Sequence, residues 1–189
     1  MSLDDLLARV RACRLCAPIL DPRPVLRLSP RSRVLVIGQA PGSKVHASGV
    51  PWEDASGDHL LEWLDVDRDA FEDPDNFGIL PMAFCYPGVG KSGDLPPPKL
   101  CAETWQAPLL EALDGPVLTL LVGQYAQAQV LGRARKKTLT ETVRAHAEYG
   151  ALLPLPHPSW RSRGWMKRNP WFAEEVLPSL RSRVAEALG

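Results

Sequence analysis

The stretch Arg33-Val34-Leu35-Val36-Ile37-Gly38-Gln39-Ala40-Pro41-Gly42 decides the fold. Its first half is a compact run of branched apolar residues, which predicts a fully buried central strand over 33–38. Two glycines then flank a proline at the carboxyl end of that strand. Glycines there let a ligand approach the backbone, in the crevice where open α/β sheets bind ligands. The motif is neither a Walker loop nor a dinucleotide-binding fingerprint.

The rest of the chain alternates between strand-like and helix-like segments. Further strands are predicted at 77–84 (weakened by Pro81 inside it), 117–122 and 152–155. Apolar spacing predicts helices at 3–13, 56–64, 100–113, 125–131, 140–149 and 171–188, the last kinked near Pro178. Long loops are expected before residue 56 and over 87–98. This alternation predicts an α/β fold: a single three-layer domain over 1–189, with a mostly parallel four-stranded sheet and helices on both faces.

Composition narrows the class of protein. A chain of 189 residues with 45% hydrophobic and 23% charged residues has the size and balance of one folded domain, which excludes wholesale disorder. Its formal charge of zero excludes a uniformly basic nucleic-acid coat protein. No window approaches the roughly 20 apolar residues of a membrane span. The start of the chain carries Asp4 and Asp5 rather than a basic signal segment, so we expect a cytoplasmic protein.

The charge is unevenly distributed along the chain. Residues 53–75 carry ten acidic side chains and one basic one, whereas residues 133–189 carry eleven basic and five acidic ones. Two solvated faces would account for both runs, which is the common outcome for such patterns. The sharper hypothesis is that the C-terminal third of the chain forms a phosphate-binding face.

Four cysteines need an explanation, because structural disulfides are rare in the cytoplasm. Cys13 and Cys16 form a C-x-x-C pair, and Cys85 and Cys101 lie alone in the sequence. The pair by itself indicates a redox motif, half of a zinc site or half of a cluster site. A lone cysteine in an apolar strand, such as Cys85, is commonly a small buried hydrophobe. Four thiolates with none left over fit a closed site for zinc or for an iron–sulfur cluster.

Two loops combine rigid backbone with aromatic and polar side chains. The first continues from the glycine motif to Trp52, which is either core filling or a platform for base stacking. The second follows the strand at 152–155 and fixes His157 between two prolines. A lone histidine is commonly structural, but this one leads into Ser159, Trp160, Arg161 and Arg163. A rigid polar head, an aromatic wedge and a basic tail are typical of a DNA-facing loop.

Taken in order, these features resemble the uracil-DNA glycosylase superfamily, and most of all its iron–sulfur branch, family 4. Residues 38–42 look like that family's first motif, and the segment Gly49-Val50-Pro51-Trp52 matches the one whose aromatic stacks on the extruded base. The segment His157-Pro158-Ser159 looks like its second catalytic motif. The cysteine order matches the cluster ligands Cys13, Cys16, Cys85 and Cys101, with residues 1–30 as the N-terminal helix and cluster-binding segment.

The resemblance implies a monofunctional hydrolase that removes a flipped uracil, or a related deaminated base, from DNA in base-excision repair. It implies that His157 stabilises the anion on the departing base and that Gly38, Gln39, Ala40, Pro41 and Gly42 hold the water and the base edge. Trp52 would stack on the base, and Ser159, Trp160, Arg161 and Arg163 would contact DNA, single- or double-stranded. The implied cofactor is a [4Fe–4S] cluster, with structural zinc as the alternative. The implied state is a monomer without a membrane partner.

Two positions depart from the family pattern. The first motif has Gln39 where the iron–sulfur branch carries Glu, and Ala40 where other branches carry a water-orienting Asp or Asn. Pro81 stands where strand two normally presents a base-reading Asn. His46, Glu53 or Asp54 are candidates to supply the missing group, and His46 and Pro81 are placed in the base-binding set.

These departures keep two other hypotheses open. One is a damaged-DNA or abasic-site binding protein that retains the scaffold with little or no glycosylase activity. The other is a zinc-stabilised α/β protein of small-molecule metabolism.

Overall fold

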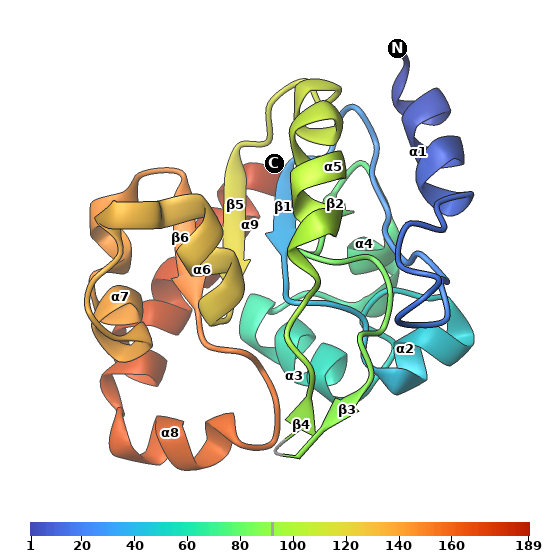
Figure 1. Ribbon diagram of the computed structural model, residues 1–189. Helices are drawn as coiled ribbons and strands as arrows, with labels where there is room; N and C mark the ends of the chain where they lie inside the picture. Colours follow the sequence, from blue (N-terminus) through green and yellow to red (C-terminus); the bar gives the residue numbers. More distant parts are fainter. Residues whose placement is uncertain (92) are drawn as a thin grey trace.

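The computed structural model describes residues 1–91 and 93–189. Four parallel strands form its central sheet in the order β2-β1-β5-β6. They are β1 (Val34–Ile37), β2 (Phe77–Ile79), β5 (Leu118–Val122) and β6 (Leu152–Leu155). In the register, Val34 pairs with Phe77 on one side and with Leu118 on the other. Figure 1 shows helices on both sides of this sheet, so the predicted three-layer α/β domain is confirmed.

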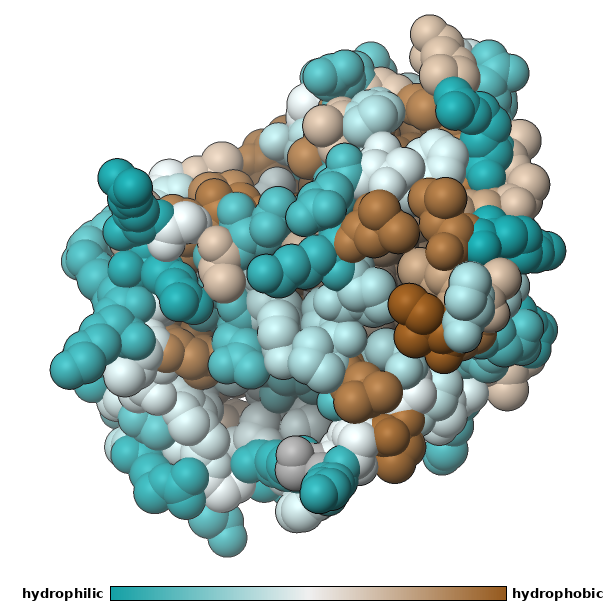
Figure 2. Space-filling view, in the orientation of Figure 1, coloured by the Kyte–Doolittle hydropathy of each residue, from teal (hydrophilic) through white to brown (hydrophobic). Residues whose placement is uncertain are grey.

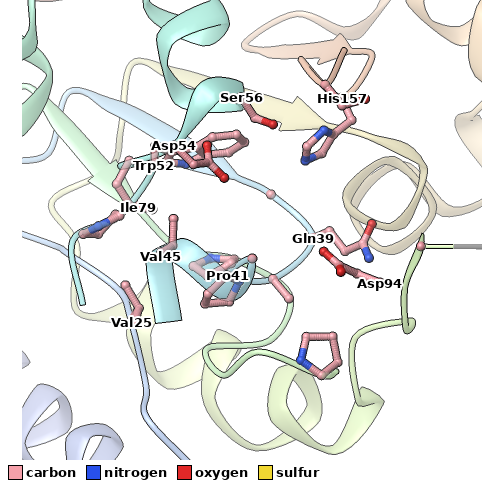
Figure 3. A pocket seen from close by; sticks show the side chains of 18 of the residues that line it. Val25, Gln39, Pro41, Val45, Trp52, Asp54, Ser56, Ile79, Asp94 and His157 are labelled. Carbon is pink, nitrogen blue, oxygen red and sulfur yellow. The ribbon is translucent and has the colours of Figure 1, made fainter. Parts of the chain in front are cut away.

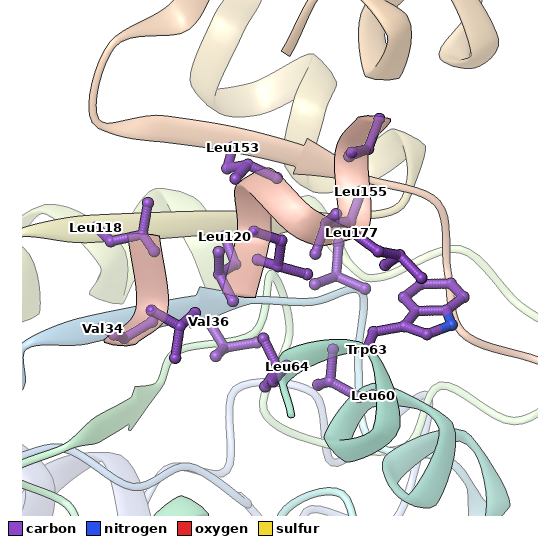
Figure 4. Close-up of a cluster of buried hydrophobic side chains, with 14 of the residues drawn as sticks. Val34, Val36, Leu60, Trp63, Leu64, Leu118, Leu120, Leu153, Leu155 and Leu177 are labelled. Carbon is purple, nitrogen blue, oxygen red and sulfur yellow. The ribbon is translucent and has the colours of Figure 1, made fainter. Parts of the chain in front are cut away.

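Every residue of β1 is buried, because both faces of the sheet are covered. Val34 and Val36 face a cluster formed mainly by α3 (Ala55–Leu64) and α9 (Leu177–Leu188), shown in Figure 4. Leu35 and Ile37 face the opposite cluster, which contains side chains of α1 (Leu3–Arg11), α5 (Lys99–Glu111) and α6 (Gln124–Leu131). Successive strand residues point to opposite faces, and this explains why the run is apolar throughout rather than alternating.

A proline-rich crossing segment covers the free edge of β2. The backbone N–H of Arg27 donates to the carbonyl of Ile79 over 3.1 Å, and that of Val25 donates to Phe84 over 2.7 Å. The predicted extension of β2 to residue 84 is wrong, because regular pairing stops at Ile79 and Pro81 lacks the N–H that a longer ladder would use.

Several short elements lie in segments for which the sequence predicted neither a helix nor a strand. They are α2 (Ser43–Ser48), α4 (Arg68–Glu72), α8 (Ser162–Arg168), β3 (Val89–Gly90) and β4 (Gly93–Asp94); Ser92, inside the loop predicted at 87–98, lies outside the described residues. Such elements are too short to leave a periodic apolar signal. The helix predicted at 140–149 is α7 (Leu139–Arg144) followed by a 3₁₀ turn, His146–Tyr149.

The last predicted helix is divided before Pro178. A π-helical turn, Phe172–Val176, precedes α9, and Pro178 lies in the first turn of α9. Proline is tolerated there because the first N–H groups of a helix have no partner within it. Among the described residues, no helix combines the length and apolar character needed to cross a membrane.

Candidate functional site

A cavity of about 360 Å³ opens at the carboxyl edge of the sheet. Its wall comes from the loops after β1, β2 and β6, from the start of α3 and from the β3–β4 hairpin (Figure 3). The residues that line the cavity include Gly38, Gln39, Ala40, Pro41, Gly42, Trp52, Asp54, Ser56, Pro81, Asp94, His157, Ser159 and Arg161. The two loops singled out in the sequence therefore meet at one site, although more than 100 residues separate them.

Trp52 forms an aromatic wall opposite His157. The two ring centroids lie 5.9 Å apart, with 32° between the ring planes. Trp52 has a backbone φ of 60°, which residues other than glycine rarely adopt, so contacts with the surrounding residues must hold this conformation in place. A Cβ atom on Gly57 would lie 1.7 Å from the Trp52 carbonyl oxygen, and one on Gly38 would lie 3.1 Å from the Trp52 ring. The two glycines thus let α3 and β1 approach Trp52 closely.

His157 is a neutral imidazole at physiological pH. Burial lowers its pKa below the usual value of 6.5, and the charges of Asp54 and Asp94 oppose that shift only in part. A neutral imidazole in a partly desolvated site donates a hydrogen bond without carrying a charge of its own. The ring is therefore suited to donate a hydrogen bond to an atom of a bound ligand on which negative charge develops.

The loop after His157 is fixed to α3 by His59. Arg163 Nη2 lies 3.2 Å from His59 Nε2, and His59 Nδ1 lies 3.3 Å from the carbonyl oxygen of Pro158. An arginine can only donate, so the His59 proton belongs on Nδ1, which then donates to Pro158. Arg163, predicted as a DNA contact, thus has a partner within the protein. His59 was missed by the sequence reasoning, because nothing local connects it to a loop 99 residues away.

The remaining predicted DNA-contact residues lie at the rim. The side chain of Trp160 is 73% exposed, and the guanidinium carbon of Arg161 lies 5.3 Å from the centroid of its ring. Arg161 and Ser159 also line the cavity. An exposed aromatic with a stacked cation beside a cavity is suited to contact bases and phosphate.

The glycine motif is tied to the segment after β2. The carbonyls of Gly38 and Gln39 accept from the N–H groups of Met82 and Ala83 over 2.9 and 3.1 Å. Gln39 Nε2 lies 3.4 Å from the carbonyl of Leu95. Pro81 lines the cavity but offers no side-chain hydrogen bond.

Of the three candidates for the missing polar group, only Asp54 lines the cavity. His46 lies outside the lining, with its Nε2 3.5 Å from Asp21 Oδ2 and its ring 6.0 Å from that of Tyr86. Glu53 is exposed and also lies outside it. Asp94 and Ser56 were not singled out in the sequence. Asp94 lies in a glycine- and proline-rich segment that gives no periodic signal in the sequence, and its place in the cavity wall follows from the pairing of β3 with β4.

The four cysteines line a second, small pocket that is apolar. Cys13 and Cys16 follow α1, Cys85 follows β2, and Cys101 lies in the first turn of α5. Burial, with a smaller contribution from the neighbouring cysteines, raises the pKa of Cys85 to about 11 and that of Cys101 to about 12. Four thiols and few other polar groups form the donor set that zinc or iron–sulfur clusters use. Within residues 1–91 and 93–189, no three His, Cys, Asp or Glu side chains are grouped closely enough to hold a metal ion.

The parallel α/β sheet and a polar, partly aromatic cavity at its carboxyl edge define a ligand-binding site of the open α/β class. The chain matches the model of the uracil DNA glycosylase superfamily over residues 27–181, and it belongs to that superfamily. The match includes both loops of the cavity, Cys85 and Cys101; Cys13 and Cys16 precede it. Membership supports a glycosylase-like function in DNA repair, with DNA as the substrate.

Proposed function

We propose that this protein is a monofunctional DNA glycosylase that hydrolyses the N-glycosidic bond of uracil, or of a related deaminated base, flipped out of DNA. The observation that carries the proposal is the pairing of Trp52 with a neutral His157 across one cavity. The first provides a face on which any base can stack, and the second provides a donor for the charge that the departing base acquires. Both are needed to break this bond without a covalent nucleophile.

The binding step requires the base to leave the DNA stack, at a cost of a few kcal/mol. Stacking on Trp52 offsets part of that cost, since base–aromatic stacking contributes about 1–3 kcal/mol per base. Trp160 at the rim would fill the gap left in the DNA, and Arg161 would neutralise a phosphate beside it. The basic C-terminal third of the chain, which contains both residues, would face the strand.

In the chemical step the bond between C1′ and the base breaks, and negative charge grows on the base. His157 donates a hydrogen bond to that charge. A donor of this kind, already oriented before the reaction, contributes about 2.7–4 kcal/mol in other enzymes. The imidazole must be neutral for this role, because a charged ring would have to be buried at a further cost. Pro81 leaves the base edge to other groups, and the Ser56 hydroxyl is one donor that the cavity supplies.

We also propose that Cys13, Cys16, Cys85 and Cys101 hold a [4Fe–4S] cluster, with structural zinc as the alternative. The support is that all four thiols line one apolar pocket, although they come from three separate segments of the chain between residues 13 and 101. The group would join these segments and supply stability rather than chemistry, because four protein ligands leave no open position. A [4Fe–4S] protein absorbs broadly in the visible, whereas a zinc protein is colourless.

A panel of oligonucleotides tests the proposed activity. Uracil, hypoxanthine, xanthine and thymine opposite guanine are placed in single- and double-stranded DNA, and abasic sites are revealed by alkaline cleavage. We expect excision of uracil, and a loss of about 10²–10³-fold in His157→Ala, as for removal of an anion-stabilising donor. His146→Ala is the matched control, since His146 lies in the 3₁₀ turn before β6 and outside the cavity. Absence of cleavage at every base would contradict the proposal.

A second candidate function is binding of abasic or damaged DNA without turnover. It is favoured by Gln39, Ala40 and Pro81, which lack the polar groups that the family pattern places there. The same panel distinguishes it. Tight binding to abasic DNA, with slow cleavage that His157→Ala leaves unchanged, would support the binding protein over the enzyme.

A further inference from the structure

Hydrolysis needs a group that orients a water molecule and accepts its proton. The first motif does not provide one. Gln39 is an amide, which does not take up a proton at physiological pH, and Ala40 has no polar atom. The group must therefore come from another part of the cavity wall.

Two carboxylates line the cavity, and they differ in their surroundings. Asp54 is the N-cap of α3, and its Oδ1 accepts from the N–H of Gly57 over 2.9 Å. Its other oxygen faces Gly42, 3.7 Å from where a Cβ would lie. Asp54 is partly buried and follows Trp52 by two residues, so it lies beside the stacking wall. One oxygen of this carboxylate is therefore occupied in capping α3, and the side chain lies next to Trp52 rather than next to Gln39.

Asp94 is an exposed residue of the β3–β4 hairpin at the mouth of the cavity. The hydroxyl of Tyr86 donates to Asp94 Oδ1 over 3.2 Å, which orients the carboxylate and leaves Oδ2 for another partner. Gln39 Nε2 lies 3.4 Å from the carbonyl of the next residue, Leu95, and Figure 3 shows Gln39 and Asp94 together, away from Trp52 and Asp54. The hairpin thus brings a carboxylate to the amide of the first motif.

The hairpin also meets the loop of His157. Arg161 Nη1 lies 3.2 Å from where a Cβ on Gly93 would lie, so the guanidinium packs on the hairpin backbone. Asp94 is, in addition, one of the two charges that His157 experiences. Asp94, Gln39 and His157 therefore line the part of the cavity in which the sugar of a nucleotide would lie if its base were stacked on Trp52.

We propose that Asp94, assisted by Gln39, orients and deprotonates the water that attacks C1′, an assignment that rests on the proposed glycosylase function. The water oxygen forms a bond to C1′ as the bond from C1′ to the base nitrogen breaks. The electron pair of the broken bond goes to the base, whose charge His157 holds. The water proton passes to the Asp94 carboxylate and then to solvent, and the released base takes up one proton from solvent.

Single-turnover excision of the preferred base tests this role in the full-length protein. Asp94→Asn keeps the shape of the side chain and removes its proton acceptor. We expect its rate of base release to fall by about 10²–10⁴-fold, the usual contribution of a general base. Asp94→Glu should recover a measurable part of that rate. Affinity for DNA with an abasic site should stay within about twofold of the unaltered protein, because the loss concerns the chemical step.

Two further variants make the comparison specific. Tyr86→Phe removes the hydrogen bond that orients Asp94 and should cost up to about tenfold in rate, in line with one hydrogen bond of 0.5–1.5 kcal/mol. Asp114→Asn neutralises an exposed aspartate that precedes β5, at the opposite end of that strand from the cavity, and should have no effect.

The possible results separate this assignment from the function on which it rests. An unaltered protein that releases no base overturns the glycosylase proposal and this assignment with it. An active protein in which Asp94→Asn keeps its rate, or in which Asp54→Asn loses more than Asp94→Asn, overturns the assignment alone. An Asp94→Asn variant with a lowered melting temperature and weakened DNA binding would show a structural role, which also contradicts the proposal.

Discussion

The cavity at the carboxyl edge of the sheet and the pocket of the four cysteines differ in size and in the polarity of their walls. The cavity holds about 360 Å³ and has a wall with an imidazole, two carboxylates and an arginine. The cysteine pocket is far smaller and apolar, and it lies between the segment that follows α1, residues 83–85 and the start of α5. Figure 2 shows most apolar side chains on the right half of the visible face, on the α1 side and at the β3–β4 hairpin, whereas hydrophilic ones prevail on the left half.

The difference separates a site that must exchange ligand and water from one that must exclude them. In the cavity, burial lowers the pKa of His157 and so keeps a donor neutral. In the cysteine pocket, burial raises the pKa of Cys85 and Cys101, which keeps these two thiols protonated until a metal or cluster displaces the protons. Desolvation disfavours the charged form in both places. The resulting pKa shift is downward for an imidazole, whose charged form is protonated, and upward for a thiol, whose charged form is deprotonated. The comparison predicts that changes at the first region alter the rate and that changes at the second alter stability.

Among variants outside the proposed catalytic groups His157 and Asp94, the largest effect is expected for Gly57→Ala. The added Cβ would overlap the Trp52 carbonyl oxygen, and relieving the overlap must move Trp52 or the start of α3. Overpacking of this kind costs about 1–3 kcal/mol in unfolding free energy. A shift of about 1 Å in a positioning group can cost about 10²-fold in rate. Chemical denaturation and single-turnover excision measure the two quantities.

Gly164→Ala is the matched control for that change. Gly164 lies in α8, where a Cβ would make only ordinary contact, 3.7 Å from Arg168 Nη1. Alanine in a helix is favoured over glycine by about 1 kcal/mol, so this variant should be as stable as the unaltered protein or more so. Equal rates in the two variants would show that Trp52 does not form the stacking wall.

The pH dependence of excision should follow His157. Its folded-state pKa lies below the unfolded value of about 6.5, so the neutral form is complete above pH 6.5 and is lost as pH falls through the lowered pKa. We expect the rate to be level near neutrality and to fall about tenfold per pH unit below that pKa. The contribution of His157 to stability falls earlier, as pH drops from about 6.5 to the lowered pKa, and levels off below it, because only the unfolded state binds the proton in that interval. A rate in His157→Ala with the same acid limb would assign that limb to another group.

His59→Ala should have an intermediate effect on the rate. It removes the contacts to Pro158 and Arg163 that fix the loop of His157. With each hydrogen bond contributing about 0.5–1.5 kcal/mol, base release should slow by about tenfold while the affinity for abasic DNA changes little. His59→Asn offers a shorter side chain with a donor and an acceptor and should recover part of the rate. If both variants match the unaltered protein, the loop is rigid without His59.

The smallest effect on the rate is expected at the cysteines. Cys101→Ser should reduce the visible absorbance or the bound metal, and should lower the stability by more than the roughly 0.5 kcal/mol of an ordinary surface substitution. The rate per folded molecule should remain near that of the unaltered protein. Thermal denaturation, elemental analysis and excision by the folded fraction measure the three quantities. A large loss of rate with unchanged stability would reverse the roles assigned to the two regions.

Much of the fold could be predicted because its signals are local. The strands predicted at 33–38 and 117–122 differ from β1 and β5 by at most one residue at each end, and the capping box of Ser2 and Asp5 begins α1. The prediction was wrong for the length of β2 and missed α2, α4, α8 and the hairpin. In β2 an apolar run continues past the point where pairing ends, and the short elements are stabilised by contacts with distant segments rather than by their own pattern.

The sequence by itself determined the order of the strands along the chain, the two loops that carry Trp52 and His157, and the positions of the four cysteines. These follow from turn chemistry, burial periodicity and residue type, which neighbouring residues express. Only the tertiary structure decided that Asp54 and Asp94 line the cavity while His46 lies outside it, and that His59 holds the loop of His157. Such placements depend on contacts between segments as many as 104 residues apart, for which the local sequence carries no signal.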